Sequence, residues 1–354
     1  MTSALEHEPA LSLESLENRQ IDPTRPLLEV DQLVMRYKIK AGEVSAVEDV
    51  SFTIHEGEAV GLVGESGCGK TSIALSLLRL LPSNAKYVSG EIRLNGENLL
   101  ELSGEEMRQR RWKEIAMVFQ GAMNSWNPVY RVGDQIREAL DTHYRGAMNY
   151  DEQRAHMEKL FSSVGLPPAM LDRYPHEFSG GMRQRAVIAM ALSCSPELII
   201  ADEPTTALDV IVQDQILKEL KRIQADLGMS IIYISHDIAV IAEVTDSIGV
   251  MYAGKLVEYG ATADVFARPR HPYAYLLLRS TPSITGPRRQ LAPLEGEPPD
   301  LLHPPTGCRF HPRCPFATER CATDVPPLED IGGGHKVACW HHDQVPALEA
   351  ALQR

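Results

Sequence analysis

Apolar residues follow two periods along the chain, and segments of the two kinds alternate. Short, almost wholly apolar runs are typical of buried strands, whereas apolar residues three and four positions apart are typical of helices. Strand-like runs occur at LLEVDQLVMRY, VSAVEDVSFTI, EAVGLVG, ELIIADEP, SIIYISHD and SIGVMYAGKLVEYG, and helical patterns such as KTSIALSLLRLL separate the later runs. This alternation predicts an α/β core with fully buried strands.

A helical block interrupts the core, and a proline-rich stretch follows it. From about residue 128 to residue 194 the pattern is mostly helical, with breaks at GLPP and YPHEFSGG. After about Ser280 the stretch TPSITGPRRQLAPLEGEPPDLLHPP is typical of a linker or an extended wrapping segment. We therefore expect a flexible extension over 1–27, an α/β domain over 28–280 with a helical subdomain at about 128–194, and a C-terminal extension over 281–354.

The segment GESGCGKT, residues 64–71, has the pattern G-x-x-x-x-G-K-[ST] and lies between an apolar strand and a helix. Glycines let consecutive backbone N–H groups face phosphates, and the helix N-terminus adds positive potential. Lys70 is expected to reach the β and γ phosphates, and Thr71 to offer its hydroxyl to Mg²⁺. A purely structural glycine turn is the alternative. The predicted nucleotide-binding residues here are Gly64, Glu65, Ser66, Gly67, Cys68, Gly69, Lys70, Thr71 and Ser72.

Two adjacent carboxylates end the apolar strand LIIADE. A magnesium-dependent nucleotide hydrolase needs such groups, so Asp202 is expected to hold the metal and Glu203 to orient or deprotonate the attacking water. A surface turn is the alternative, but unpaired carboxylates beside a buried strand are costly. The sequence therefore predicts nucleotide hydrolysis.

Charge and composition exclude some classes of function. The net charge of -13 argues against a nucleic-acid partner, because phosphate binding needs a cationic surface. The longest apolar runs fall well short of the roughly 18 residues of a membrane-spanning helix. The first residues, MTSALEHEPALSLESLENRQ, lack the basic and then apolar order of a secretion signal, which favours a cytoplasmic protein.

The segment FSGGMRQR, residues 178–185, resembles the signature motif of the ATP-binding-cassette (ABC) ATPases, whose commonest form is LSGGQ. Here Phe and Met replace Leu and Gln, so the side-chain amide of the family motif is absent. Ser179 can cap a helix that begins at Gly180, and Gly181 leaves the backbone open, which makes this helix N-terminus a second anion site.

The resemblance covers about residues 28–280 and implies a P-loop NTPase fold, with a RecA-like core, an antiparallel β subdomain and a helical subdomain. It implies that Gln120, in VFQ, senses metal and water, and that Asp209, in TTALD, lies at the dimer seam. His236, in ISHD, matches the switch that touches the γ-phosphate, and Tyr37 the aromatic residue that stacks on adenine. The catalytic residues implied are Lys70, Glu203 and His236, and the Mg²⁺ ligands are Thr71, Gln120 and Asp202.

The motifs GESGCGKT and FSGGMRQR, together with the segment RHPYAYLLLRSTP, look like the oligopeptide/dipeptide permease subfamily of these ATPases. The resemblance implies an ATP-hydrolysing importer subunit at the cytoplasmic face of a bacterial membrane. Its partners would be a second ATPase subunit, usually a different chain, two transmembrane permease subunits and an extracytoplasmic substrate-binding protein. Peptides are the expected cargo, with nickel or oligosaccharides as alternatives.

Four cysteines lie close together near the C-terminus, at Cys308, Cys314, Cys321 and Cys339. Their spacing, C-x5-C-x6-C-x17-C, lacks the C-x2-C pairs usual in zinc sites, and loosely spaced thiolates suit a [4Fe–4S] cluster. Some members of the family carry such a cluster in this extension. A cluster that staples the extension is therefore expected, with zinc or merely packed cysteines as alternatives.

A soluble ABC ATPase that acts on ribosomes or DNA is the competing class of function. Such proteins generally carry two cassettes or long coiled-coil insertions and a cationic contact surface, none of which the sequence contains. A pure binding module is disfavoured by the complete set of catalytic residues.

Overall fold

The computed structural model describes residues 20–144, 146–206, 208–280 and 294–345. The chain divides into two compact units. The helical unit comprises the described residues of Arg108–Ile199 and Pro204–Met229, with Gln20 and Ile21. The sheet unit comprises Asp22–Met107, Ile200–Glu203 and the described residues from Ser230 onward. Most of the extension predicted over 1–27 lies outside the described residues, and β1 begins at Pro26.

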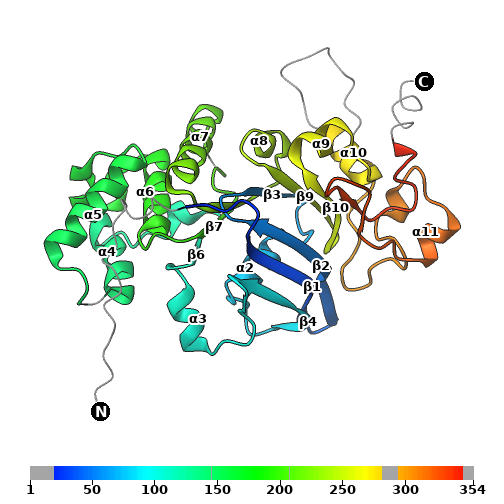
Figure 1. Cartoon of the computed structure of the whole chain (residues 1–354), viewed down its shortest axis with the longest axis horizontal. Helices are drawn as coiled ribbons and strands as arrows, with labels where there is room; N and C mark the ends of the chain where they lie inside the picture. The colour runs from blue at the N-terminus through cyan, green and yellow to red at the C-terminus, as the bar shows by residue number, and fades with distance from the viewer. Residues whose placement is uncertain (1–19, 145, 207, 281–293, 346–354) are drawn as a thin grey trace. The chain divides into compact units, whose positions relative to one another are not determined.

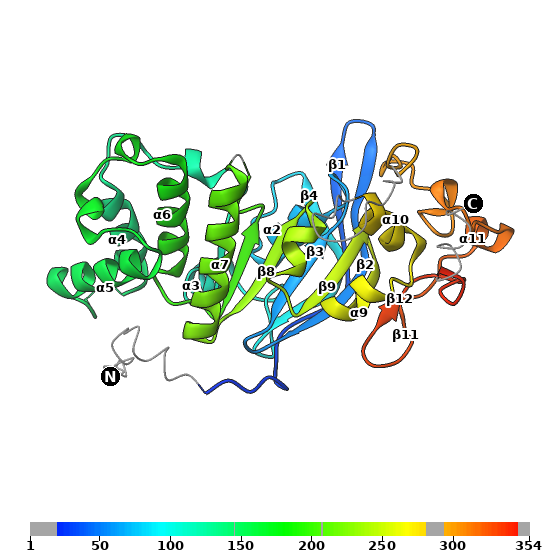
Figure 2. The ribbon, with the colours of Figure 1, turned by 90° about the horizontal axis from the view of Figure 1, so that it is seen from above.

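The sheet unit contains a four-stranded antiparallel sheet with the order β2-β1-β4-β5. Its strands are β1 (Pro26–Ile39), β2 (Gly42–His55), β4 (Ala85–Leu94) and β5 (Glu97–Asn98). β1 and β2 form the long ribbon that is visible in Figure 2, with Tyr37 opposite Val44. β-Branched and other apolar residues alternate with polar ones along both strands and bury one face of the sheet.

A second sheet contains the predicted buried strands. β3 (Ala59–Val63) lies parallel to β8 (Ser230–Ser235) and β9 (Ser247–Tyr252), and all five residues of β3 are buried. In the sheet unit the order is β11-β12-β10-β9-β3-β8-β7. The remaining strands are β7 (Leu198–Asp202), β10 (Lys255–Ala261), β11 (Glu329–Asp330) and β12 (Lys336–Val337). The predicted α/β core with fully apolar strands is confirmed.

Short helices accompany the strands of the sheet unit. The phosphate-loop helix α2 (Lys70–Leu77) ends four residues earlier than its apolar pattern predicts, because Arg79 takes a positive φ of 49°. The other helices of the unit are α8 (Ile238–Ala242), α9 (Thr262–Ala267), α10 (Pro272–Ser280), η4 (His311–Arg313) and α11 (Glu319–Thr323). α3 (Gly104–Arg110) spans the point at which the chain passes from the sheet unit to the helical unit.

The helical unit is built from amphipathic helices, which Figure 1 shows in green. Its elements are β6 (Ile115–Val118), η1 (Ala122–Asn124), α4 (Val132–His143), α5 (Tyr150–Ser163), η2 (Pro168–Asp172), η3 (Pro175–Glu177), α6 (Gly180–Leu192) and α7 (Val210–Leu227). A capping box between Asn149 and Glu152 begins α5, and Gly228, with φ of 60°, ends α7. β6 pairs with the beginning of β7, where the Leu198 N–H donates to the Glu114 carbonyl (3.0 Å).

The described part of the C-terminal extension packs on the sheet unit. Phe310 is 1% exposed, and its ring lies 5.1 Å from that of Tyr252 and 5.4 Å from that of Tyr273. The Arg309 guanidinium donates to the Ala253 carbonyl and to Ser45 Oγ. β12 pairs with β10, so the extension also continues the larger sheet. Packing on the sheet unit therefore supplies stability that was expected to come from a metal cluster.

A buried carboxylate reinforces this attachment. Glu258, on β10, is fully buried, and it accepts hydrogen bonds from the backbone N–H groups of Arg270 and His271 (2.8 Å each). His335 Nε2, from the extension, lies 2.7 Å from the same carboxylate. Buried polar groups are tolerated when they are hydrogen-bonded in this way. Among the described residues, no helix is both long enough and apolar enough to cross a membrane.

Removing the Phe310 ring should detach the extension from the sheet unit. We expect Phe310→Ala to lower the free energy of unfolding by about 3 kcal/mol, because a fully buried aromatic side chain leaves a cavity. Denaturant unfolding followed by circular dichroism measures the change. The exposed Val325→Ala is the control, and equal midpoints for the two variants would show that Phe310 does not anchor the extension.

The stability of the sheet unit should fall in acid because of His271. Complete burial lowers the pKa of His271 to about 3, and its Nδ1 accepts a hydrogen bond from the Tyr273 N–H (3.0 Å). The unfolded chain binds the proton near its usual pKa of about 6.5, so this contribution is present above that pH and is lost as the pH falls toward 3. We expect His271→Asn to flatten the decline of the unfolding free energy between pH 7 and pH 5. The same slope in wild type, in His271→Asn and in the exposed control His303→Asn would contradict this account.

Candidate functional site

The phosphate loop follows β3 in a conformation that requires glycine at two positions. Gly64 has φ of 151°, and a Cβ there would lie 2.2 Å from the Met251 carbonyl oxygen. Gly69, which precedes α2, has φ of 106°, and its Cβ would lie 2.3 Å from the Ala46 carbonyl oxygen. Both approaches involve backbone atoms, so no side chain could move aside. The loop is therefore packed between β2 and the end of β9.

Lys70 lies inside this loop and is 7% exposed. Its Nζ donates to the carbonyl oxygens of Gly64 (2.7 Å) and Glu65 (3.0 Å), and it lies 3.5 Å from Cys68 Sγ. These contacts place the ammonium at the centre of the loop. Burial raises the pKa of the Cys68 thiol, which is consistent with a packed, neutral cysteine.

Thr71 and Asp202 meet at the end of β7. Thr71 Oγ1 donates to Asp202 Oδ2 (2.9 Å), and Asp202 is 1% exposed. Its Oδ1 is buried and has no hydrogen-bond partner among the described residues. Burial raises the pKa of the Asp202 carboxyl, and the neighbouring charge of Glu203 adds to this effect. A buried carboxylate oxygen without a donor, beside a threonine hydroxyl, fits Mg²⁺, which prefers oxygen ligands.

Glu203 and His236 form a pair at the ends of β7 and β8. His236 Nδ1 lies 3.0 Å from Glu203 Oε1, and the exposed fractions of the two side chains are 66% and 17%. Glu203 has φ of 47°, a left-handed conformation that is costly for a residue with a side chain. Its N–H donates to the Ile234 carbonyl (2.9 Å), so β8 stabilises this geometry. The pair is partly open to solvent and could act on a water molecule.

Tyr37 lies next to the helix that follows the phosphate loop. Its hydroxyl is 3.2 Å from Ser72 Oγ, and the ring is half-buried on β1. The sheet unit thus brings Tyr37 and the residues of the phosphate loop together, and it also pairs Thr71 with Asp202 and Glu203 with His236.

The helical unit carries the other predicted ATP-site residues. Ser179 caps α6 and accepts a hydrogen bond from the Met182 N–H (3.3 Å), as the motif predicts. Gly180 and Gly181 form the first turn of α6. Asp209 caps α7 in the same way, with the Val212 N–H as donor (2.9 Å), and Gln120 is exposed after β6. Ser179 and Asp209 are also exposed.

Tyr273 and Arg313 form hydrogen bonds with the phosphate loop, and neither was predicted to lie there. Tyr273, in the segment RHPYAYLLLRSTP, accepts a hydrogen bond from the Glu65 N–H (2.9 Å). Arg313 donates to the Glu65 carboxylate (2.7 Å), and it also donates to the Tyr252 hydroxyl (3.2 Å). In the sequence Arg313 directly precedes Cys314, for which a metal cluster was expected. The only available signal was its position three residues after an isolated Phe in a polar stretch.

Two family models match the chain. The model described as "ABC transporter" matches residues 47–206, and the one described as "Oligopeptide/dipeptide transporter, C-terminal region" matches residues 257–321. The "Probable peptide ABC transporter ATP-binding protein y4tR" of Sinorhizobium fredii is 46% identical over 324 residues, which is 91% of this chain and 97% of that protein. The chain belongs to the ATP-binding subunits of the oligopeptide/dipeptide ABC transporters. It therefore binds and hydrolyses ATP as part of a transporter.

Further relatives agree with this assignment. The oligopeptide transport ATP-binding protein OppD of Salmonella typhimurium is 43% identical over 332 residues, which is 93% of this chain and 98% of that protein. Among solved structures, the dimeric ATP-binding cassette MJ0796 in a post-hydrolysis state, bound to ADP and Pi, matches with a TM-score of 0.60. The identity is 27%, and the match covers 66% of this chain and 98% of that one. These matches favour an oligopeptide/dipeptide transporter subunit over an ATPase that acts on ribosomes or DNA.

The four cysteines of this transporter subunit are brought together without forming a metal site. Cys308, Cys314, Cys321 and Cys339 line one cavity of about 10 Å³, beside Phe310. That volume is about what one water molecule needs. In the part of the chain that the structure describes, no group of three or more His, Cys, Asp or Glu side chains could hold a metal ion. The predicted [4Fe–4S] cluster is wrong, and zinc at this site has no support.

Burial also affects the protonation of three of these thiols. Burial raises the pKa of both Cys314 and Cys339 to about 12, and it also raises that of Cys308. Burial acts in this way because it disfavours the charged thiolate. Two arginines beside these cysteines lie close to carboxylates. Arg313 pairs with Glu65, and Arg309 lies 3.5 Å from Glu48.

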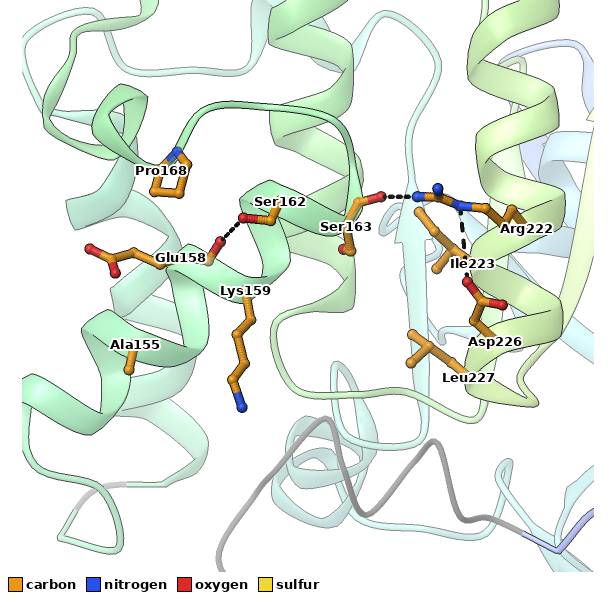
Figure 3. Close-up of a pocket in the computed structure, with 10 residues that line it drawn as sticks. All are labelled: Ala155, Glu158, Lys159, Ser162, Ser163, Pro168, Arg222, Ile223, Asp226 and Leu227. Carbon is orange, nitrogen blue, oxygen red and sulfur yellow. Dashed lines mark hydrogen bonds and ion pairs between the residues drawn. The ribbon is translucent and has the colours of Figure 1, made fainter.

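A separate pocket of about 630 Å³ lies in the helical unit (Figure 3). α5 and η2 form one side of it, and α7 forms the other. Arg222 donates to the Ser163 carbonyl (2.9 Å) across it, and Glu158 and Lys159 line the α5 side. None of the predicted ATP-site residues lines this pocket. Its size therefore says nothing about where ATP binds.

Replacing Glu203 should stop hydrolysis and spare ATP binding. We expect Glu203→Gln to reduce ATP turnover by the assembled transporter by about a hundredfold or more, because an amide cannot accept the proton of the attacking water. Phosphate release measures turnover, and retention of labelled ATP measures binding. The exposed Glu329→Gln is the control. Turnover at the wild-type rate would mean that Glu203 is not the base, or that the partner's site does the hydrolysis.

Proposed function

We propose that this chain powers the uptake of oligopeptides or dipeptides through a bacterial membrane. The observation that carries the proposal is the site at the ends of β3, β7 and β8, where Thr71 and Asp202 are paired and Glu203 lies beside His236. A cargo of peptides is supported by the names of its relatives, among them the dipeptide transport ATP-binding protein DppD of Bacillus subtilis, which is 45% identical over 321 residues.

The described residues have distinct roles in this proposal. Lys70 binds the β and γ phosphates, and Tyr37 stacks on the adenine. Thr71 and Asp202 would hold Mg²⁺, with Gln120 as a further ligand, and the ion supplies charge that offsets the phosphates. Glu203 orients and deprotonates the attacking water, and His236 contacts the γ-phosphate.

The nucleotide would join two ATPase subunits. The helix N-terminus capped by Ser179 is a second anion site, and in the ABC ATPases the signature motif of one subunit closes on the ATP held by the other. We infer that Gly180, Gly181 and Asp209 serve the partner subunit's ATP. Binding of ATP then closes the pair, and hydrolysis reopens it, so the membrane subunits alternate between two states.

The proposal includes partners and a location. We infer a second ATPase subunit, encoded as a different chain, two transmembrane permease subunits and an extracytoplasmic substrate-binding protein, with this chain at the cytoplasmic face of the membrane. The division into an ATPase domain over 28–280 with a helical subdomain at about 128–194, and an extension over 281–354, is part of the same proposal.

Uptake by the assembled transporter tests the cargo. We expect Lys70→Ala to abolish ATP-dependent uptake of labelled trialanine into vesicles that carry the whole transporter, because the loop loses its ammonium group. Uptake of nickel and of a labelled maltotriose should stay at background with or without the substitution. Nickel or maltotriose uptake that requires Lys70, with no uptake of trialanine, would replace peptides by that cargo. Glu329→Gln, on the exposed surface, is the control.

A further inference from the structure

The C-terminal extension contacts the phosphate loop through one ion pair. The guanidinium of Arg313, in η4, lies on the carboxylate of Glu65, with Nη1 donating to Oε2 (2.7 Å) and Nη2 to Oε1 (3.1 Å). Parallel hydrogen bonds of this kind fix both the distance and the orientation of the two groups. The Arg313 side chain is 6% exposed and that of Glu65 is 25% exposed. Water therefore screens the pair only in part.

Other contacts hold the Arg313 side chain in place. Its Nε donates to the Glu295 carbonyl (2.9 Å), and its Nη1 also donates to the Tyr252 hydroxyl (3.2 Å). Phe310, three residues earlier, packs on the rings of Tyr252 and Tyr273. The packing of these aromatic rings thus holds the segment that carries Arg313 in place, so the guanidinium can position the Glu65 carboxylate.

Glu65 is fixed at its backbone as well as at its side chain. Its N–H donates to the Tyr273 hydroxyl (2.9 Å), and its carbonyl accepts from Lys70 Nζ (3.0 Å) and from the Cys68 N–H (3.2 Å). Glu65, which forms the ion pair with Arg313, therefore also contacts the ammonium group of Lys70. A displacement of the Glu65 side chain is transmitted to its own backbone, and from there to Lys70.

Charge gives the pair a second role. Glu65 places a carboxylate in the loop that receives the nucleotide's phosphates, and like charges in a partly desolvated site repel each other. The Arg313 guanidinium offsets that carboxylate. Without it, the loop would present an uncompensated negative charge close to the phosphates.

We propose that Arg313 is a positioning residue for nucleotide binding. It fixes the position of the Glu65 side chain, and through the Glu65 carbonyl it fixes that of the Lys70 ammonium group. It also offsets the negative charge of Glu65. The C-terminal extension is then a supporting part of the ATP site. This inference goes beyond the proposed function and is independent of the cargo.

A double-mutant cycle on the full chain tests the proposal. We expect Arg313→Met to raise the Kd of fluorescent mant-ATP with Mg²⁺ by about tenfold, within the range usual for coupled sites. Arg313→Lys, which keeps the charge but loses the parallel hydrogen bonds, should give an intermediate Kd. In the Arg313→Met background, Glu65→Gln should restore part of the affinity, because it removes the uncompensated charge. In the assembled transporter, KM for ATP should rise more than kcat falls.

The matched control is Arg320→Met, at an arginine of the same extension that is mainly exposed and pairs with Asp324. It should leave the Kd unchanged. Arg313→Met with the affinity of Arg320→Met would overturn the proposal, as would losses for Arg313→Met and Glu65→Gln that simply add in the double variant. If Arg313→Met gives no cooperative thermal transition, Arg313→Lys and Tyr273→Phe test the same contacts in folded protein. Wild-type affinity in both of these would also overturn the proposal.

Discussion

The close approach of the phosphate loop to its surroundings is the constraint on which the site depends. Gly64 and Gly69 lie against the carbonyl oxygens of Met251 and Ala46 at distances that exclude a Cβ. Within this closely packed loop, two of its own carbonyl oxygens accept hydrogen bonds from Lys70. The parallel strands β3, β8 and β9 hold the loop at their carboxyl ends, where ligands bind in open α/β sheets.

The catalytic pairs follow from the same sheet. β8 lies next to β3, and β7 lies next to β8, so Thr71 reaches Asp202 and His236 reaches Glu203. The raised pKa of Asp202 and the positive φ of Glu203 are costs that the fold tolerates in this place. Perturbed groups and strained backbone of this kind cluster at functional sites because function, and not stability, requires them.

The C-terminal extension shows how a segment with few apolar residues becomes ordered. Phe310 enters an aromatic cluster, β12 pairs with β10, and Arg309, Arg313 and His335 each find a polar partner in the ATPase core. A metal held by the four cysteines would have ordered this segment through ligands that are close together in the sequence. The extension instead uses long-range contacts, and its four cysteines line a small cavity.

The sequence by itself determined the strands, the phosphate loop, the acidic pair and the cap at Ser179, because each depends on residues close together in the chain. The family followed from motifs of the same kind. Only the tertiary structure decided the partners of Arg313, Glu258 and His335. Glu65 and Arg313 are 248 residues apart in the sequence, and Glu258 and His335 are 77 residues apart. It also decided the protonation of the cysteines. Burial and long-range pairing set both, and neither leaves a periodic or local signal in the sequence.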